Sequence, residues 1–228
     1  AVTSAELLAL AAIDEGRFAQ AFPSFGPERR GAPVMAFARI DDEQIRNRTA
    51  VQTPDVVCVL DPSILSIVDV TQGMPEEGTL VLNWWHPVEQ LREEYGITCR
   101  LALVNANLSA REVIGRVITN TTMLGALVKA TEATGAEPLE AAIQHRFGRI
   151  AARNIAAFGR AVGSNIPRRR AAPRFPRLRS LRRSAPRRGA RAQSGGLVNA
   201  GISAPSATFC RNARPVSSAS RIVTSMSR

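Results

Sequence analysis

Three short apolar runs set the strongest limit on how this chain can fold. They are Val56–Leu60, Thr79–Asn83 and Cys99–Asn105, and helix-like segments follow the first two, over Ser63–Val68 and His86–Tyr95. Strands that are apolar throughout and that alternate with helices are typical of a parallel sheet covered on both faces. We therefore expect an α/β fold with a mostly parallel sheet.

The rest of the first 163 residues supplies further elements of the same kind. Segment Ala21–Ile40 holds two strand-like runs around a turn, and the polar stretch Ile45–Thr53 leads from it to the next strand. Apolar residues at helical spacing predict four more helices, over Ser4–Gly16, Thr121–Thr134, Pro138–Phe147 and Arg149–Val162. Together these elements predict a Rossmann-like layered domain.

Charge divides the chain near residue 163. Residues 1–163 hold 15 Lys and Arg against 19 Asp and Glu, whereas residues 164–228 hold 15 Arg and no acidic residue. A segment rich in Arg and Pro buries too little apolar surface to offset the entropy lost on ordering. We expect a folded domain over 1–163, a disordered basic linker over 164–194 and a low-complexity tail over 195–228.

Few residues offer chemistry of their own. Cys58, Cys99 and Cys210 stand apart with no CxxC pair, so no disulfide framework, zinc site or iron–sulfur site is predicted. No catalytic motif surrounds His86 or His145. No apolar run reaches the roughly 20 residues of a membrane helix, and the start of the chain lacks a signal-peptide pattern. We expect a cytoplasmic protein with no catalytic residue, no metal site and no membrane contact.

The turn within Ala21–Ile40 is the strongest candidate for binding. Gly26-Pro27 forces the chain to bend, because proline fixes its own φ and restricts the residue before it. Glu28, Arg29, Arg30 and Gly31 follow, and two planar guanidiniums beside a glycine suit a phosphate or a carboxylate. On composition alone, a hairpin tip whose arginines pair with Glu28 or with surface carboxylates is the favoured interpretation.

The same segment carries a family resemblance. Gln20–Pro33, QAFPSFGPERRGAP, resembles the signature of the gamma subunit of pyruvate:ferredoxin oxidoreductase and related 2-oxoacid:acceptor oxidoreductases. The likeness continues through Pro54–Pro62, Asn120–Ala126 and Lys129–Thr131, and covers about residues 1–163. In this family a glycine-rich strand-to-helix turn precedes the stretch that Ala1–Ser4 resembles. The resemblance therefore implies a Rossmann-like domain that is N-terminally truncated.

Two short stretches of the tail, residues 195–201 and 211–216, resemble the start of a ferredoxin-like delta module. The cysteines that such a module needs for its clusters do not follow. The tail is interpreted as a possible degenerate start of that module.

The resemblance implies a subunit of a larger enzyme. In this family thiamine diphosphate, Mg²⁺ and [4Fe–4S] clusters lie in partner subunits of alpha, beta and delta type. A 2-oxoacid, here pyruvate, loses CO2, the acyl group passes to CoA, and electrons pass to ferredoxin or flavodoxin. This chain would bind no cofactor alone, would be inactive alone, and would help to assemble the complex and position CoA. The residues implied at the CoA site or subunit interface are Ser24, Gly26, Glu28, Arg29, Arg30, Gly31, Asn105, Asn120 and Thr121.

Two other function classes stay open. A nucleic-acid-binding protein would use the arginines after residue 163 against phosphates, but Phe175 is the single aromatic residue of the basic linker, which disfavours stacking on bases. A standalone nucleotide-binding module is the second class, and the missing glycine-rich turn counts against it. Salt-sensitive retention on DNA would favour the first, and saturable nucleotide binding by the isolated chain the second.

Overall fold

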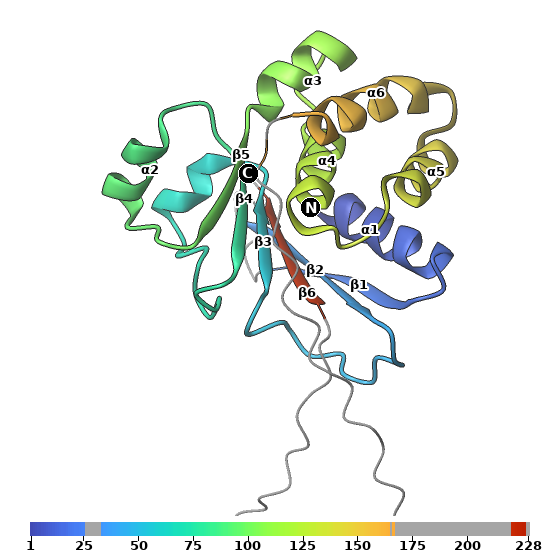
Figure 1. Cartoon of the computed structure of the whole chain (residues 1–228), viewed down its shortest axis with the longest axis horizontal. Helices are drawn as coiled ribbons and strands as arrows, with labels where there is room; N and C mark the ends of the chain where they lie inside the picture. The colour runs from blue at the N-terminus through green and yellow to red at the C-terminus, as the bar shows by residue number, and fades with distance from the viewer. Residues whose placement is uncertain (26–32, 165, 167–219, 227–228) are drawn as a thin grey trace, which may run out of the picture. The chain divides into compact units, whose positions relative to one another are not determined.

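A six-stranded sheet forms the centre of the molecule, with helices on both faces (Figure 1). The computed structural model describes residues 1–25, 33–164, 166 and 220–226, all of which belong to one compact unit. The strands are β1 (Phe18–Ser24), β2 (Val34–Asp41), β3 (Val56–Val59), β4 (Thr79–Asn83), β5 (Arg100–Val104) and β6 (Ser220–Met226). The helices are α1 (Val2–Asp14), α2 (Val88–Tyr95), α3 (Ala106–Ile114), α4 (Asn120–Thr131), α5 (Ala136–Phe147) and α6 (Ala151–Val162). Two short 3-10 helices complete the set, η1 (Pro62–Ser66) and η2 (Gly148–Ile150).

The strand order is β1-β2-β6-β3-β4-β5. Strands β6, β3, β4 and β5 run parallel, while β2 pairs antiparallel with both β1 and β6. Strand β2 is therefore the one reversed strand among those described, and the expectation of a mostly parallel α/β sheet is confirmed. The predicted hairpin is present too, since β1 and β2 pair in a register that sets Ser24 opposite Met35.

The sheet has an apolar layer on each face because successive strand residues point to opposite sides. In β3, Val56 and Cys58 pack into the larger layer, beneath α1, α4, α5 and α6, while Val57 and Val59 pack into the smaller one, beneath η1 and α2. All four residues are buried, which is why this run reads as apolar throughout. Burial raises the pKa of the Cys58 thiol to about 12, as befits a small core side chain.

Three elements differ from the sequence-based expectation. Helix α3 follows β5, where the sequence predicted no helix, and the helix-like segment Ser63–Val68 contains a 3-10 helix. Strand β6 falls in the expected low-complexity tail. Ile166, beyond the expected domain end, is buried in the larger core layer. The remaining residues of the expected linker and tail, apart from Ser164, lie outside the described residues, so the expected domain division stays a prediction.

Candidate functional site

Five of the described strands have their carboxyl ends at one edge of the sheet, which is where α/β domains usually bind ligands. Strand β1 runs in the same direction as β3, β4 and β5, because β1 and β6 both pair antiparallel with β2. The candidate residues 24–31 follow β1 at this edge, and Asn105 follows β5. These are the outermost strands, five spacings apart, or about 24 Å at about 4.8 Å per spacing. The structure therefore does not bring Asn105 to the candidate loop.

Asn105 and Asp61 hold the starts of helices at this edge. The Asn105 Oδ1 atom accepts a hydrogen bond of 2.9 Å from the backbone N–H of Leu108 and so caps α3. The Asp61 Oδ1 atom accepts a bond of the same length from the N–H of Ser63 and caps η1. Both are ordinary helix caps. This capping role explains why residue 105 is an asparagine, and no bound ligand is needed to explain it.

Asn83, which the sequence analysis did not single out, joins three chain segments. Its side chain is 1% exposed at the end of β4. The Nδ2 atom donates to the Leu60 carbonyl at 2.9 Å and to Asn107 Oδ1 at 3.1 Å, while Oδ1 accepts from the Ala106 N–H at 2.9 Å. The sequence did contain one signal for Asn83. A polar residue ends an otherwise apolar strand there, and a buried amide group must have hydrogen-bond partners.

The start of α4 packs into the protein interior. Helix α4 begins at Asn120, one residue before the predicted start at Thr121, and Thr119 is its N-cap. Thr121 is buried, and its hydroxyl bonds to Asn154 Oδ1 of α6 at 3.3 Å. Thr121 therefore fastens two helices together, and its side chain does not face solvent.

The candidate loop joins β1 to β2. Ser24 is the last residue of β1, and Phe25 beyond it is 70% exposed. Gly26, Glu28, Arg29, Arg30 and Gly31 lie outside the described residues. The β1–β2 pairing brings the two ends of this loop together, since Ser24 and Met35 are opposite one another.

A cavity of about 660 Å³ lies beside the base of this loop. Ser24, Phe25 and Pro33 border it on the loop side, and Met35, Phe37 and Val57 form part of its floor on the sheet. The other lining residues are Ala50, Val51, Gln52, Pro54, Ile64, Val68, Asp69, Val70, Gln72 and Gly73. A largely apolar cavity of this size suits a small organic ligand.

Close backbone packing fixes one wall of the cavity. Gly73 has a φ of +75°, and a Cβ atom built on it would overlap the carbonyl oxygen of Gln52, so this position requires glycine. Asp69 supplies a negative charge at the same wall. Its Oδ1 atom accepts bonds from the hydroxyl of Thr71 at 2.6 Å and from the N–H of Thr71 at 2.9 Å, which lower the pKa of the carboxyl group.

Aromatic side chains gather at the end of β4. Trp84 is 8% exposed, and its ring lies 5.3 Å from that of His86 and 6.4 Å from that of Tyr95, between ring centroids. The Trp84 Nε1 atom donates to the Pro87 carbonyl at 3.3 Å. Trp85 is 48% exposed and also lies 5.3 Å from His86. This cluster belongs to the smaller core layer and to its surface.

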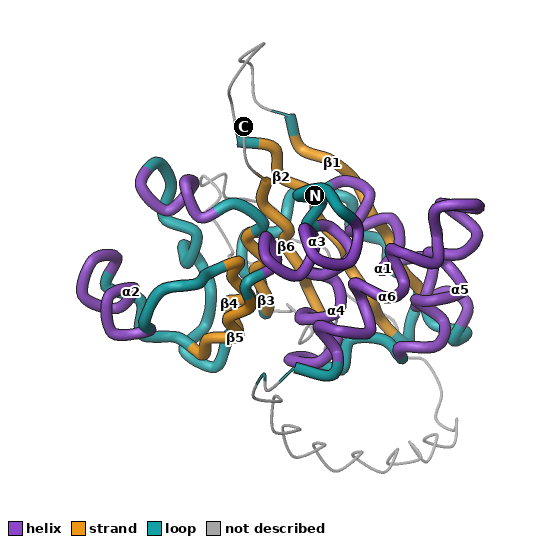
Figure 2. Tube along the Cα trace, turned by 90° about the horizontal axis from the view of Figure 1, so that it is seen from above, coloured by secondary structure: helices purple, strands orange, loops and turns teal. Residues whose placement is uncertain are grey.

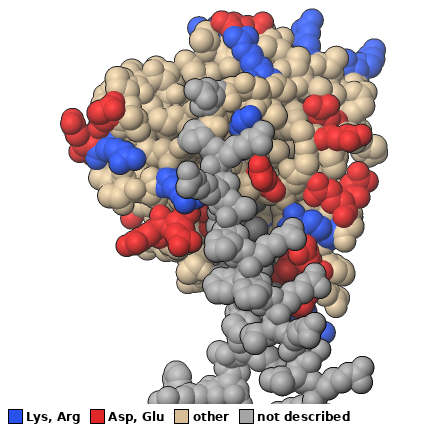
Figure 3. All heavy atoms as spheres, in the orientation of Figure 1, with Lys and Arg blue, Asp and Glu red and all other residues tan. Residues whose placement is uncertain are grey.

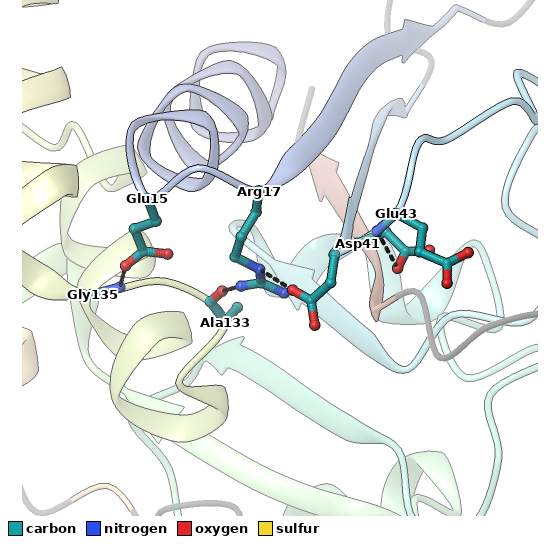
Figure 4. A network of polar contacts seen from close by, with 7 residues as sticks. Glu15, Arg17, Asp41, Glu43, Ala133 and Gly135 are labelled. Carbon is teal, nitrogen blue, oxygen red and sulfur yellow. Dashed lines mark hydrogen bonds and ion pairs between the residues drawn. The ribbon is translucent and has the colours of Figure 1, made fainter. Parts of the chain in front are cut away.

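A polar network at the opposite edge ties β1 to the helices (Figure 4). The Arg17 Nε atom lies 3.3 Å from Asp42 Oδ1, and its Nη1 atom donates to the Ala133 carbonyl at 2.7 Å. Glu15 accepts a bond of 2.6 Å from the Gly135 N–H. These contacts include pairs more than 100 positions apart and hold the start of the hairpin against the loop between α4 and α5.

The surface of the described part carries both signs of charge. On the face in Figure 3, Lys and Arg side chains lie among Asp and Glu side chains, which differs from the basic stripe typical of a nucleic-acid-binding domain. Among the described residues, no group of three or more His, Cys, Asp or Glu is placed to hold a metal ion. No helix in that part combines the length and apolarity needed to cross a bilayer.

These features define a class of protein: a Rossmann-like α/β domain with a cavity against its sheet, beside the base of the β1–β2 loop. The profile of the family described as pyruvate ferredoxin/flavodoxin oxidoreductase matches residues 1–164. The chain belongs to this family, and the resemblance carried by Gln20–Pro33 is confirmed.

The chain is similar to subunits with closely related names. It is 49% identical over 159 residues to the pyruvate/ketoisovalerate oxidoreductases common subunit gamma of Thermococcus litoralis, which covers 69% of this chain and 86% of the relative. It is 43% identical over 158 residues to the pyruvate synthase subunit PorC of Methanothermobacter thermautotrophicus, covering 69% and 84%. The crystal structure of the pyruvate oxidoreductase subunit PORC of Thermotoga maritima superposes with a TM-score of 0.63 at 36% identity, covering 71% of this chain and 87% of that one.

Proposed function

We propose that this chain is the gamma subunit of a thiamine-diphosphate-dependent pyruvate:ferredoxin oxidoreductase, which forms acetyl-CoA, CO2 and reduced ferredoxin. One observation carries the proposal: the chain is 49% identical to the gamma subunit of Thermococcus litoralis over 159 residues, which cover 86% of that subunit. Partners of alpha, beta and delta type follow from this assignment. A cytoplasmic location is part of the proposal, and isolated cysteines suit a reducing compartment.

The reactive groups of such an enzyme do not fit the part of this chain that the structure describes. The described residues offer no carboxylate or histidine cluster for Mg²⁺. Cys58 packs in the larger core layer and Cys99 packs against the smaller one, so the two do not make a cluster site. Decarboxylation and electron transfer are therefore assigned to the partner subunits, and this chain contributes binding surface.

That surface includes the candidate loop and the cavity beside it. Coenzyme A joins an anionic nucleotide to a long, partly apolar arm. The loop sequence contains Arg29 and Arg30, and the residues at the two ends of the loop, Phe25 and Pro33, border a largely apolar cavity. Because β1 and β2 pair, the two ends of the loop are fixed. The loop therefore loses less conformational entropy when it binds a phosphate group. Exposed Phe25 at the same place suits contact with a partner subunit.

The experiment is co-expression of this chain with the thiamine-binding and iron–sulfur chains of the same organism. We expect them to purify together in a fixed ratio and to reduce ferredoxin with pyruvate only when CoA is present. The isolated chain should show no such reaction. Failure to co-purify, or CoA-dependent pyruvate oxidation by the chain alone, would overturn the assignment.

A further inference from the structure

Arg39 is a buried charged residue within the β1–β2 hairpin, at one side of the sheet (Figure 2). It interrupts the apolar run of residues 34–40 and is only 5% exposed. A buried charge is costly unless its donors have partners. The Nη1 atom donates to the Asn47 carbonyl at 3.2 Å, and the Nη2 atom donates to the Thr49 carbonyl at 2.6 Å. Arg39 therefore fastens the segment between β2 and β3, residues 42–55, to the hairpin.

Gln20 holds the same segment from β1. It lies directly opposite Arg39 in the hairpin, and its Nε2 atom donates to the Ile45 carbonyl at 3.2 Å. Within the segment, the Asn47 Oδ1 atom accepts bonds from the N–H of Thr49 at 2.9 Å and from its hydroxyl at 2.8 Å. This local turn joins the two residues whose carbonyls bind Arg39, so three side chains together fix this part of the segment.

The fixed segment continues into one wall of the cavity described above. The residues of this wall follow closely after Thr49 and are Ala50, Val51, Gln52 and Pro54. Gly73 packs against the Gln52 backbone. Contacts before the wall and within it therefore determine where it lies.

Arg39 also supports the floor of the cavity, through an aromatic pair. Alternate strand residues point the same way, so Phe37 and Arg39 lie on one face of β2. The Arg39 guanidinium carbon lies 5.5 Å from the centroid of the Phe22 ring, which is within the range of a cation–π contact. The centroid of that ring lies 5.3 Å from that of Phe37, which forms part of the cavity floor. One guanidinium thus contacts the support of the wall and the support of the floor.

We infer that Arg39 is a positioning residue for ligand binding, which holds the wall at residues 50–54 and the floor at Phe37 in a fixed relation. Arg39 does not line the cavity itself, so it acts on a ligand only through the residues that it places. That the ligand is coenzyme A rests on the function proposed above. A wall that is fixed before binding loses less conformational entropy when a ligand enters, so releasing the wall should weaken binding.

Trypsin cleavage of the full-length chain measures how firmly the segment is held, because Arg46 and Arg48 are exposed within it. Arg39→Met removes the donors but keeps a long side chain, and water can reach the released carbonyls because both belong to exposed residues. Since cleavage of a held segment requires local opening, we expect fragments cut after Arg46 and Arg48 to form about tenfold faster in Arg39→Met. Arg100→Met, at an exposed position on β5, is the matched control and should leave this rate unchanged.

Arg39→Lys keeps a cationic donor without the planar fork. Its cleavage rate should fall between those of Arg39→Met and the unchanged chain, and it is the variant to measure if Arg39→Met does not fold. In the assembled complex of the proposed enzyme, Arg39→Met should raise KM for CoA about fivefold with little change in kcat. Arg39→Lys should restore part of this loss, and Arg100→Met should cause none.

Cleavage that is unchanged in both Arg39 variants would overturn the inference, whether or not coenzyme A binds. Faster cleavage together with an unchanged KM for CoA would overturn the role in ligand binding. If the unchanged complex oxidises pyruvate equally well without CoA, the proposed function is wrong instead, and the cleavage rates alone decide whether Arg39 holds the wall.

Discussion

Gly125 of α4 lies against the backbone of Phe158 in α6, so closely that a Cβ atom at residue 125 would overlap the Phe158 carbonyl oxygen. The same atom would lie 2.9 Å from Cβ of Ala161. The absence of a side chain at this position lets the two buried helices meet, and it accounts for a glycine inside a helix that is otherwise buried on nearly all sides.

We expect Gly125→Ala to lower the free energy of unfolding by about 1–3 kcal/mol, because the added methyl group forces α4 and α6 apart. Gly159→Ala is the matched control. A methyl group at residue 159 of α6 would have no neighbouring atom within 4 Å, so this change should leave stability unchanged or raise it by up to about 1 kcal/mol through helix propensity. Urea unfolding measures both, and equal midpoints for the two variants would contradict the packing argument.

Replacing Asn83 should weaken the carboxyl edge of the sheet. Asn83→Leu keeps the size of the side chain but removes partners from the Leu60 carbonyl and the Ala106 N–H, so we expect a loss of at least about 2 kcal/mol. Asn105→Ala removes one helix cap and should lose only about 1 kcal/mol. Thermal unfolding of the two variants measures both losses of stability. A larger loss for Asn105→Ala than for Asn83→Leu would contradict this prediction.

The buried thiol of Cys58 predicts a pH dependence at the alkaline end. Its pKa is raised from 9.0 to about 12 in the folded chain by burial. Between these values the unfolded chain releases the thiol proton while the folded chain keeps it, so the free energy of unfolding falls as pH rises. The slope reaches at most about 1.4 kcal/mol per pH unit. In Cys58→Ala the free energy of unfolding should no longer fall with pH through this group above pH 9. If the dependence on pH is the same in the variant and the unchanged chain, the prediction is wrong.

Arg29→Ala and Arg30→Ala test the CoA proposal in the assembled complex. Loss of a charge-assisted bond should weaken CoA binding by about 1–3 kcal/mol, raising KM for CoA while pyruvate decarboxylation stays near its original rate. Arg116→Ala, on an exposed turn, serves as the control and should leave both unchanged. If the Arg29 and Arg30 variants drop out of the complex, the loop is an assembly element. If they assemble with unchanged CoA dependence, no clamp on CoA exists there.

The parallel part of the fold follows from local sequence because its strands are buried on both faces. Val56–Val59 and Leu80–Leu82 are apolar without alternation, and short runs of this kind between helices are typical of parallel strands. Helix α3 had usable signals in Asn105 at its start and Gly115, with a φ of +82°, at its end. These two signals were not recognised because the sequence of α3 is only weakly apolar.

The remaining features depend on distant partners, which no local pattern reveals. Strand β6 pairs with residues more than 160 positions away. Asn83 is explained only when the ends of β3 and β5 are placed beside it. The candidate residues were taken from family likeness as one set, yet Ser24 and Asn105 follow the two outermost strands of the sheet, because sequence similarity does not reveal the order of strands.

The pair Trp84 and Trp85 accounts for all the tryptophan in the chain. Intrinsic fluorescence of this protein is therefore a local reporter of the end of β4 and the neighbouring α2. An acrylamide titration should resolve two emitters, one shielded and one accessible. Separation of the β1–β2 hairpin, on the far side of β6, would leave that emission nearly unchanged, so a fluorophore attached to β1 is needed to see it.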